Sequence, residues 1–216
     1  MDAELAGDEN RHSNLSKPTT PRLKKTRWLT EMRRAIFLDR DGVLIENRPG
    51  YVRSWADVSV LPGVPQALQA LRRANFVLLI VSNQSAVGRG LMDLSAVQAL
   101  QQQIEAELTR MGGGVDGAYL CPHAPEMNCD CRKPKPGLIL QGAQDWQVDL
   151  SASFLIGDAL SDLQAARAVG VRPVLVRSGR GAIQEQLLDA QEWAGLAVFD
   201  HLADAAEWIC AQGGIS

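Results

Sequence analysis

Short apolar runs alternate along the chain with longer segments whose apolar residues recur at helical spacing, and this alternation limits the fold more than any other feature. The short runs have the length of buried strands, and the longer segments have the period of amphipathic helices. The predicted strands span 35–39, 76–82, 116–120, 153–157, 172–176 and 196–199. The predicted helices span 63–74, 94–111, 136–147, 160–169, 181–191 and 202–212.

A regular order of strand and helix predicts right-handed crossovers and a parallel sheet with helices on both faces. The expected fold class is therefore α/β, a Rossmann-like three-layer sandwich. Ligands of such sheets bind beyond the carboxyl ends of the strands. Residues that carry chemistry are accordingly expected where the apolar runs end.

Two acidic residues follow the first run, which leads from Ala35 into Asp39, Arg40, Asp41 and Gly42. Two carboxylates so close repel each other and an incoming phosphate, and a hard cation such as Mg²⁺ relieves this repulsion best. One ionised carboxylate can attack phosphorus, while its neighbour protonates the leaving oxygen and then activates water. Taken alone, the motif is equally compatible with a simple turn, because Asp and Gly are common turn residues.

Polar residues follow the second run, in Ser82-Asn83-Gln84-Ser85 and then in Gly88-Arg89-Gly90. A hydroxyl, an amide and exposed backbone N–H groups at a strand end can hold phosphate oxygens. Without the other motifs, these residues would indicate only a polar loop.

Three of the four cysteines are crowded between positions 121 and 131. Cys121, His123, Cys129 and Cys131 supply three thiolates and one imidazole, which is the ligand set of a tetrahedral Zn²⁺ site. Four protein ligands leave no position for a catalytic water, so a structural zinc is expected. Incidental buried cysteines beside a surface histidine are the alternative. Cys210, in the last predicted helix, is expected to be a packed core thiol.

A basic segment, Arg132-Lys133-Pro134-Lys135-Pro136-Gly137, directly follows the cysteine cluster. Its prolines exclude helix until Pro136 can occupy a first helical turn. A rigid metal-binding loop can present Lys133 to phosphate, although such a segment is usually an exposed basic loop.

The fourth run also ends in an acid, Asp158. This carboxylate can complete the cation site that the first two acids begin. Asp162, four residues later, is equally compatible with a favourable charge in the first turn of a helix and no catalytic duty.

Residues 1–34 lack apolar periodicity and are predicted to be a mobile N-terminal extension of a single domain over 35–216. The extension is basic from Lys17 onward, but a solvated tail is favoured over a contact with nucleic acid or lipid. With a formal net charge of -3, no nucleic-acid partner is expected. No apolar run approaches the roughly 20 residues of a membrane span, and no signal-peptide core is visible. A cytoplasmic monomer is therefore expected.

In their order, the four motifs resemble the haloacid dehalogenase superfamily of phosphatases over almost all of the predicted domain. The resemblance implies a nucleophile at Asp39, a general acid/base at Asp41, a phosphate-binding hydroxyl at Ser82, a charge-neutralising lysine at Lys133 and a magnesium-binding acid at Asp158. It also implies that Asp39 and the backbone carbonyl of Asp41 share the magnesium with Asp158.

Within the superfamily, the Asn83-Gln84-Ser85 and Gly88-Arg89-Gly90 segments, the CPH…CxCRKPxPG block and Pro49-Gly50-Tyr51-Val52 resemble the heptose bisphosphate phosphatases. This resemblance implies hydrolysis of the 7-phosphate of D-glycero-D-manno-heptose 1,7-bisphosphate through an aspartyl-phosphate, on the route to lipopolysaccharide or S-layer sugars. The implied substrate contacts are Asn47, Arg48, Gly50, Tyr51, Ser82, Asn83, Gln84, Ser85, Arg132 and Lys133. Because only a short connection follows Asp41, no large cap domain is expected.

Two departures keep alternatives open. Many heptose phosphatases have lysine where this chain has Ala159. The zinc loop has five residues between His123 and Cys129, as in related histidinol-phosphatases, so histidinol phosphate is an alternative substrate. A zinc-stabilised binding protein on an inactive scaffold and a nucleic-acid 3′-phosphatase are further alternatives. The intact acids argue against the first, and the second would need a basic groove that the sequence does not reveal.

Overall fold

A computed structural model describes residues 32–212 of the chain, in which six strands form one sheet. All neighbouring strands are parallel, in the order β3-β2-β1-β4-β5-β6. The strands are β1 (Ala35–Leu38), β2 (Val77–Asn83), β3 (Gly117–Cys121), β4 (Phe154–Gly157), β5 (Arg172–Val176) and β6 (Ala197–Phe199). The strand order reverses between β1 and β4, and ligands of doubly wound sheets bind at such a switch point.

The helices confirm the alternation that the sequence predicts. They are α1 (Val64–Arg73), α2 (Ser85–Gly88), α3 (Leu94–Arg110), α4 (Gly137–Trp146), α5 (Leu160–Arg167), α6 (Gly181–Glu185) and α7 (Leu202–Gln212). The prediction for α6 ran to residue 191, but the Asp189 carboxylate accepts the backbone N–H groups of Gln191 and Glu192 and holds a turn there. Helix α2 was not predicted because one turn is too short to show a period.

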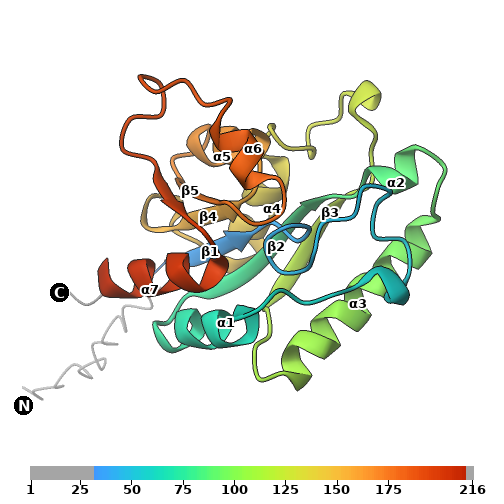
Figure 1. Cartoon of the computed structure of the whole chain (residues 1–216), viewed down its shortest axis with the longest axis horizontal. Coiled ribbons are helices and arrows are strands. Elements are labelled where there is room, and N and C mark those ends of the chain that lie inside the picture. The colour runs from blue at the N-terminus through green and yellow to red at the C-terminus, as the bar shows by residue number, and fades with distance from the viewer. Residues whose placement is uncertain (1–31, 213–216) are drawn as a thin grey trace, which may run out of the picture. The chain divides into compact units, whose positions relative to one another are not determined.

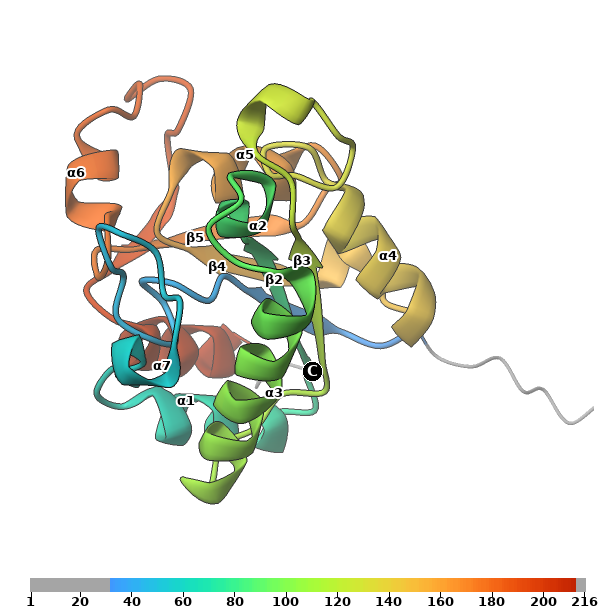
Figure 2. The same cartoon turned by 90° about the vertical axis from the view of Figure 1, so that its right-hand side faces the viewer.

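Side chains of β1 alternate between two apolar cores, as the pleat of a strand requires. Ile36 and Leu38 pack in the core that also holds Leu68 of α1, Ile104 of α3 and Ile209 of α7. Ala35 and Phe37 pack in the core that holds Ile139 of α4 and Ala165 of α5. Figures 1 and 2 show the two helix layers on opposite sides of the sheet. The three-layer α/β prediction is therefore confirmed.

The predicted N-terminal extension lies outside the described residues up to position 31. Its last two arginines belong to the folded unit instead. The Arg33 N–H donates to the Gln147 carbonyl at 2.9 Å, and the Arg34 guanidinium lies 4.5 Å from the centre of the Phe76 ring. Arg33 and Arg34 thus contact the folded residues that the prediction assigned to the domain over 35–216.

The connection between β1 and α1 leaves the carboxyl end of β1 without an inserted domain. It contains one 3₁₀ turn, Trp55–Asp57, and two isolated bridges that join Ile45 to Asp41 and to Val60.

Among the described helices, none combines the length and hydropathy that crossing a bilayer requires.

Candidate active site

A cavity of about 210 Å³ lies at the carboxyl ends of the strands, where the sequence predicts the chemistry. Asp39 and Asp41 reach it from the end of β1, and Ser82 reaches it from the end of β2. Lys133 enters from the segment before α4, and Asp162 enters from the first turn of α5. The volume is below the roughly 300–1,000 Å³ of sites that enclose a drug-sized ligand, so it suits a small polar substrate.

Lys133 joins two of the acids at the floor of the cavity. Its ammonium lies 2.6 Å from Asp39 Oδ1 and 2.5 Å from Asp162 Oδ1, and it also donates to the Val81 carbonyl at 2.7 Å. All three charged side chains are buried. A charged group with so little solvent needs several close partners, and the ammonium has three acceptors.

The amide of Asn83 fixes the backbone that carries Lys133. Its Nδ2 donates to the Lys133 carbonyl at 3.0 Å, and its Oδ1 accepts the Lys133 N–H at 3.1 Å. The nitrogen and the oxygen of the Asn83 amide therefore both bind the backbone of Lys133. Asn83, predicted as a substrate contact, therefore also positions the lysine.

Three buried carboxylates converge beside the cavity. Asp39, Asp158 and Asp162 each offer an oxygen within 4.8 Å of the others. Carboxylates this close repel one another and require positive charge in compensation. Hard oxygen donors at such spacing fit Mg²⁺. Asp39 and Asp158 are two of the three ligands that the resemblance implies, and the third is the backbone carbonyl of Asp41.

The carboxyl pKa values reflect this crowding. Burial, reinforced by Asp39 and Asp158, raises the pKa of Asp162 to about 7 even though Lys133 opposes the rise. Burial and then repulsion from Asp39 raise the pKa of Asp158, against the opposing effect of Arg180. Burial lowers the pKa of Lys133, but the attraction of Asp162 and Asp39 outweighs it and holds that pKa above its ordinary value. A further cation would therefore be bound favourably here.

Asp41 faces a different set of partners. The Arg40 guanidinium, which is fully buried, donates to Asp41 Oδ1 at 2.9 Å and to Asp41 Oδ2 at 3.0 Å. Gln84 Nε2 donates to Asp41 Oδ2 at 3.2 Å and to Ser82 Oγ at 3.0 Å. Because Ser82 Oγ accepts this bond, its own O–H remains able to donate to a ligand. Arg40 and Gln84 thus fix the orientation of the acid.

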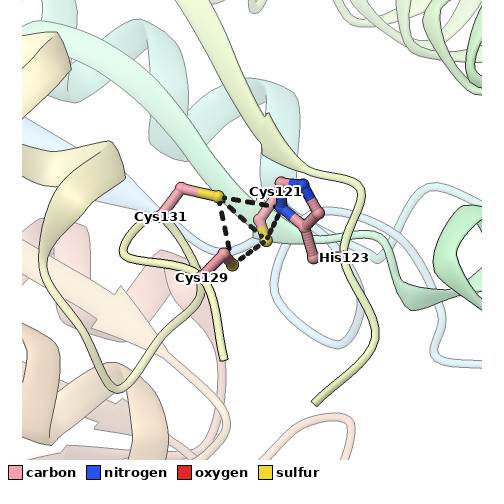
Figure 3. A group of neighbouring side chains, drawn as sticks. All are labelled: Cys121, His123, Cys129 and Cys131. Atoms are coloured by element: carbon pink, nitrogen blue, oxygen red, sulfur yellow. Dashed lines mark hydrogen bonds between the residues drawn. The ribbon is translucent and has the colours of Figure 1, made fainter. Parts of the chain in front are cut away.

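The side chains of the cysteine cluster gather in one compact group (Figure 3). The Cys131 sulfur lies 3.2 Å from Cys121 Sγ, 3.4 Å from Cys129 Sγ and 3.3 Å from His123 Nδ1. In a tetrahedral shell with metal–sulfur bonds of about 2.3 Å, the sulfurs are separated by about 3.8 Å. The three sulfur–sulfur distances, 3.2, 3.4 and 3.6 Å, are somewhat shorter than that value. Closing around an ion would need only a small outward shift of the thiolates, so the cluster is compatible with zinc.

Replacing Cys129 by serine should remove zinc and lower the melting temperature by on the order of 10 °C, because structural zinc contributes directly to folding. Activity should fall as well, since Arg132 and Lys133 directly follow the last cysteine of the cluster. Cys210→Ser is the matched control, because Cys210 lies apart from the cluster on α7. Elemental analysis and thermal melts measure both effects. Wild-type protein that carries no zinc when purified without chelator would contradict this assignment.

Most of the predicted substrate contacts line the cavity. They are Asn47, Tyr51, Ser82, Asn83, Ser85, Arg132 and Lys133. Three others do not. Gln84 is buried and turned toward Asp41, Gly50 is exposed outside the lining, and Arg48 donates to the Asp57 carbonyl and pairs with Glu46. The structure therefore does not bring these three residues to the cavity lining, and their contact with substrate stays a prediction.

The cavity also has lining residues outside the predicted set. They are Arg89, Pro125, Ser161, Asp162 and Arg180. Asp162 was left undecided, and its contact with Lys133 gives it a role at the site beyond a helix charge. Arg180 follows the end of β5, so the rule that chemistry lies where strands end would have pointed to it.

The chain resembles known phosphatases over most of its length. Residues 130–205 match a family model described as HAD-hydrolase-like. A protein from Pseudomonas aeruginosa named D-glycero-beta-D-manno-heptose-1,7-bisphosphate 7-phosphatase is 36% identical over 174 residues, which are 81% of this chain and 96% of the relative. The protein of that name from Bordetella bronchiseptica is 38% identical over 177 residues, which are 82% and 98%.

Two solved structures of heptose bisphosphate phosphatases also resemble this chain. The crystal structure of D,D-heptose 1,7-bisphosphate phosphatase from B. bronchiseptica, complexed with magnesium and phosphate, is 36% identical with a TM-score of 0.76. The match covers 83% of this chain and 99% of that one. The corresponding phosphatase from Burkholderia thailandensis is 28% identical with a TM-score of 0.60, over 81% and 97% of the two chains.

Proposed function

Because the chain belongs to the family of the heptose 1,7-bisphosphate 7-phosphatases, within the haloacid dehalogenase-like hydrolases, we propose that it hydrolyses the 7-phosphate of D-glycero-D-manno-heptose 1,7-bisphosphate. This step would serve synthesis of activated heptose for lipopolysaccharide or S-layer sugars. The observation that carries the proposal is the contact between Asp39 and Lys133 in a cavity that three arginines also line. We also propose that the protein is a cytoplasmic monomer and that it does not bind nucleic acid.

In the proposed reaction, a carboxylate oxygen of Asp39 attacks the phosphorus of the 7-phosphate and the bond to the sugar oxygen breaks. Asp41 gives a proton to that leaving oxygen and then takes one from the water that hydrolyses the aspartyl-phosphate. The products are the sugar 1-phosphate and inorganic phosphate, and Asp39 is restored. Arg40 and Gln84 hold Asp41 in place for both proton transfers.

Positive charge at the cavity floor favours the negatively charged transition state. Lys133 would bind the phosphoryl oxygens while it keeps Asp39 oriented, and the Ser82 O–H would donate to another of them. Bound Mg²⁺ would neutralise phosphoryl charge, held by Asp39, Asp158 and the backbone carbonyl of Asp41. Asp162 is the second carboxylate that pairs with Lys133.

The cationic wall of the cavity favours a substrate with a second phosphate. Arg89, Arg132 and Arg180 line it together with Lys133. One Arg132 nitrogen donates to Ser85 Oγ at 2.7 Å, and a guanidinium has further N–H donors for substrate oxygens. The amine of histidinol phosphate would be repelled by the same charges, so the bisphosphate is the better candidate.

Arg132→Ala should lower kcat/KM for heptose 1,7-bisphosphate by about 100-fold, since a lost charged contact costs a few kcal/mol. Hydrolysis of a small monophosphate such as p-nitrophenyl phosphate should fall less than about tenfold, because that substrate offers Arg132 no second phosphate. Arg110→Ala removes the same charge from an exposed site on α3 and is the control. Equal losses on the two substrates would show that Arg132 does not select the bisphosphate.

Steady-state assays of the purified protein test the proposal as a whole. We expect magnesium-dependent release of phosphate from heptose 1,7-bisphosphate, with a lower kcat/KM for histidinol phosphate and for a 3′-phosphorylated oligonucleotide. Failure to release phosphate from all three, with zinc bound and the fold intact, would favour the alternative of a zinc-stabilised binding protein.

A further inference from the structure

The loop between β5 and α6 brings Arg180 onto Asp158, which lies beneath the cavity. Arg180 Nη2 is 3.1 Å from Asp158 Oδ1, and the Arg180 backbone N–H donates to Asp158 Oδ2 at 2.8 Å. The Asp158 side chain is fully buried, whereas 55% of the Arg180 side chain is exposed. Arg180 therefore contacts a candidate magnesium ligand on one side and the cavity on the other.

The backbone of this loop is fixed without help from the guanidinium. Ser178 Oγ donates to the Gly42 carbonyl at 2.7 Å, which ties the loop to the turn after Asp41. Gly179 has a φ of +61°, and a Cβ at this position would collide with the Asp158 carboxylate and the Gly42 backbone. Only glycine allows the approach, so truncating the Arg180 side chain should leave the loop in place.

Charge balance explains why the site needs this arginine. Three buried carboxylates, Asp39, Asp158 and Asp162, meet two cations, Lys133 and Arg180. These five groups thus carry a net charge of about -1, and bound Mg²⁺ would change the net charge to about +1. Without Arg180 the same group with Mg²⁺ would be neutral, so this arginine gives the group its positive charge toward a phosphate dianion. Ala159, beside Asp158, adds no charge.

We propose that Arg180 neutralises Asp158 before magnesium binds and afterwards turns its guanidinium toward the phosphate in the cavity. This inference rests on the proposed function, because it takes Asp158 as a magnesium ligand. Arg180 therefore weakens the binding of Mg²⁺ when no phosphate is present, and it strengthens the binding of phosphate once Mg²⁺ is bound. Its side chain can move between these partners because it is the exposed member of the pair.

The proposal predicts changes of opposite sign in one variant. In Arg180→Ala, the dissociation constant of Mg²⁺ alone should fall at least about threefold, because a competing cation is gone. The dissociation constant of inorganic phosphate, measured in saturating Mg²⁺, should rise about tenfold, because a charge-assisted contact is lost. Arg180→Lys keeps the charge without the planar fork and should lie between wild type and Arg180→Ala for phosphate.

Isothermal titration calorimetry on the full-length, zinc-containing protein measures both constants, and a thermal melt checks folding. Arg73→Ala, which removes a positive charge from an exposed position on α1, should leave both constants unchanged. Weaker binding of both Mg²⁺ and phosphate in Arg180→Ala, or no change in either, would overturn the role of Arg180 while leaving the proposed function intact. A wild-type protein that binds neither would overturn both.

Discussion

Asparagine in place of Asp39 should reduce turnover by at least about 10³-fold while leaving the fold intact, because an amide nearly preserves the side chain's shape but cannot act as the anionic nucleophile. Lys133 loses one carboxylate partner in this variant and keeps Asp162. Steady-state kinetics with excess Mg²⁺ measure the loss, and thermal melts confirm that the variant is folded.

Asp130→Asn is a matched control for this substitution. The Asp130 side chain is fully exposed in the zinc loop and pairs with Lys135, so its loss should change kcat by less than about twofold. If the Asp39 variant turned over at the wild-type rate, Asp39 would not be the nucleophile and the aspartyl-phosphate mechanism would be excluded.

Replacing Lys133 by methionine should abolish activity and lower the free energy of unfolding by about 3–5 kcal/mol, since it leaves buried carboxylates without their partner. For a chain of this size the melting temperature should fall by roughly 6–20 °C. Added Mg²⁺ should restore part of the stability, because a ligand that binds the folded state stabilises it and the crowded acids attract cations. Urea unfolding with and without Mg²⁺ measures both effects.

Lys135→Met provides the comparison within the same basic segment. Lys135 pairs with Asp130 at the surface, so its loss should cost less than about 1 kcal/mol. Equal stabilities of the Lys133 and Lys135 variants would mean that the Asp39–Lys133–Asp162 group does not contribute to folding as its burial implies.

The sequence was sufficient to predict the strands and the edge at which the site lies. Apolar runs reveal buried parallel strands directly, and the topology of such sheets brings their carboxyl ends together. Asp39, Ser82 and Lys133 could be named in advance because each stands at the end of a strand, just beyond a strand or just beyond a recognisable metal-binding motif.

Contacts between distant segments were beyond sequence reasoning. The role of Asp162 depends on Lys133, which comes from another part of the chain. The position of Asp162 at the start of α5 was therefore compatible both with a helix charge and with a role at the site. Arg40 was not singled out because arginine is almost never fully buried without a partner, and its partners became apparent only in three dimensions. Gln84 was placed on the substrate side because a sequence does not reveal that its amide turns inward to Asp41.

The most direct test of the central claim is a competition assay followed by ³¹P NMR. Equal concentrations of heptose 1,7-bisphosphate and histidinol phosphate compete for one enzyme sample, so the ratio of their consumption rates gives the ratio of their kcat/KM values. We predict that the 7-phosphate signal of the heptose disappears first, that its 1-phosphate signal persists, and that histidinol phosphate remains. Faster loss of histidinol phosphate, or loss of the 1-phosphate, would contradict the assignment of the substrate.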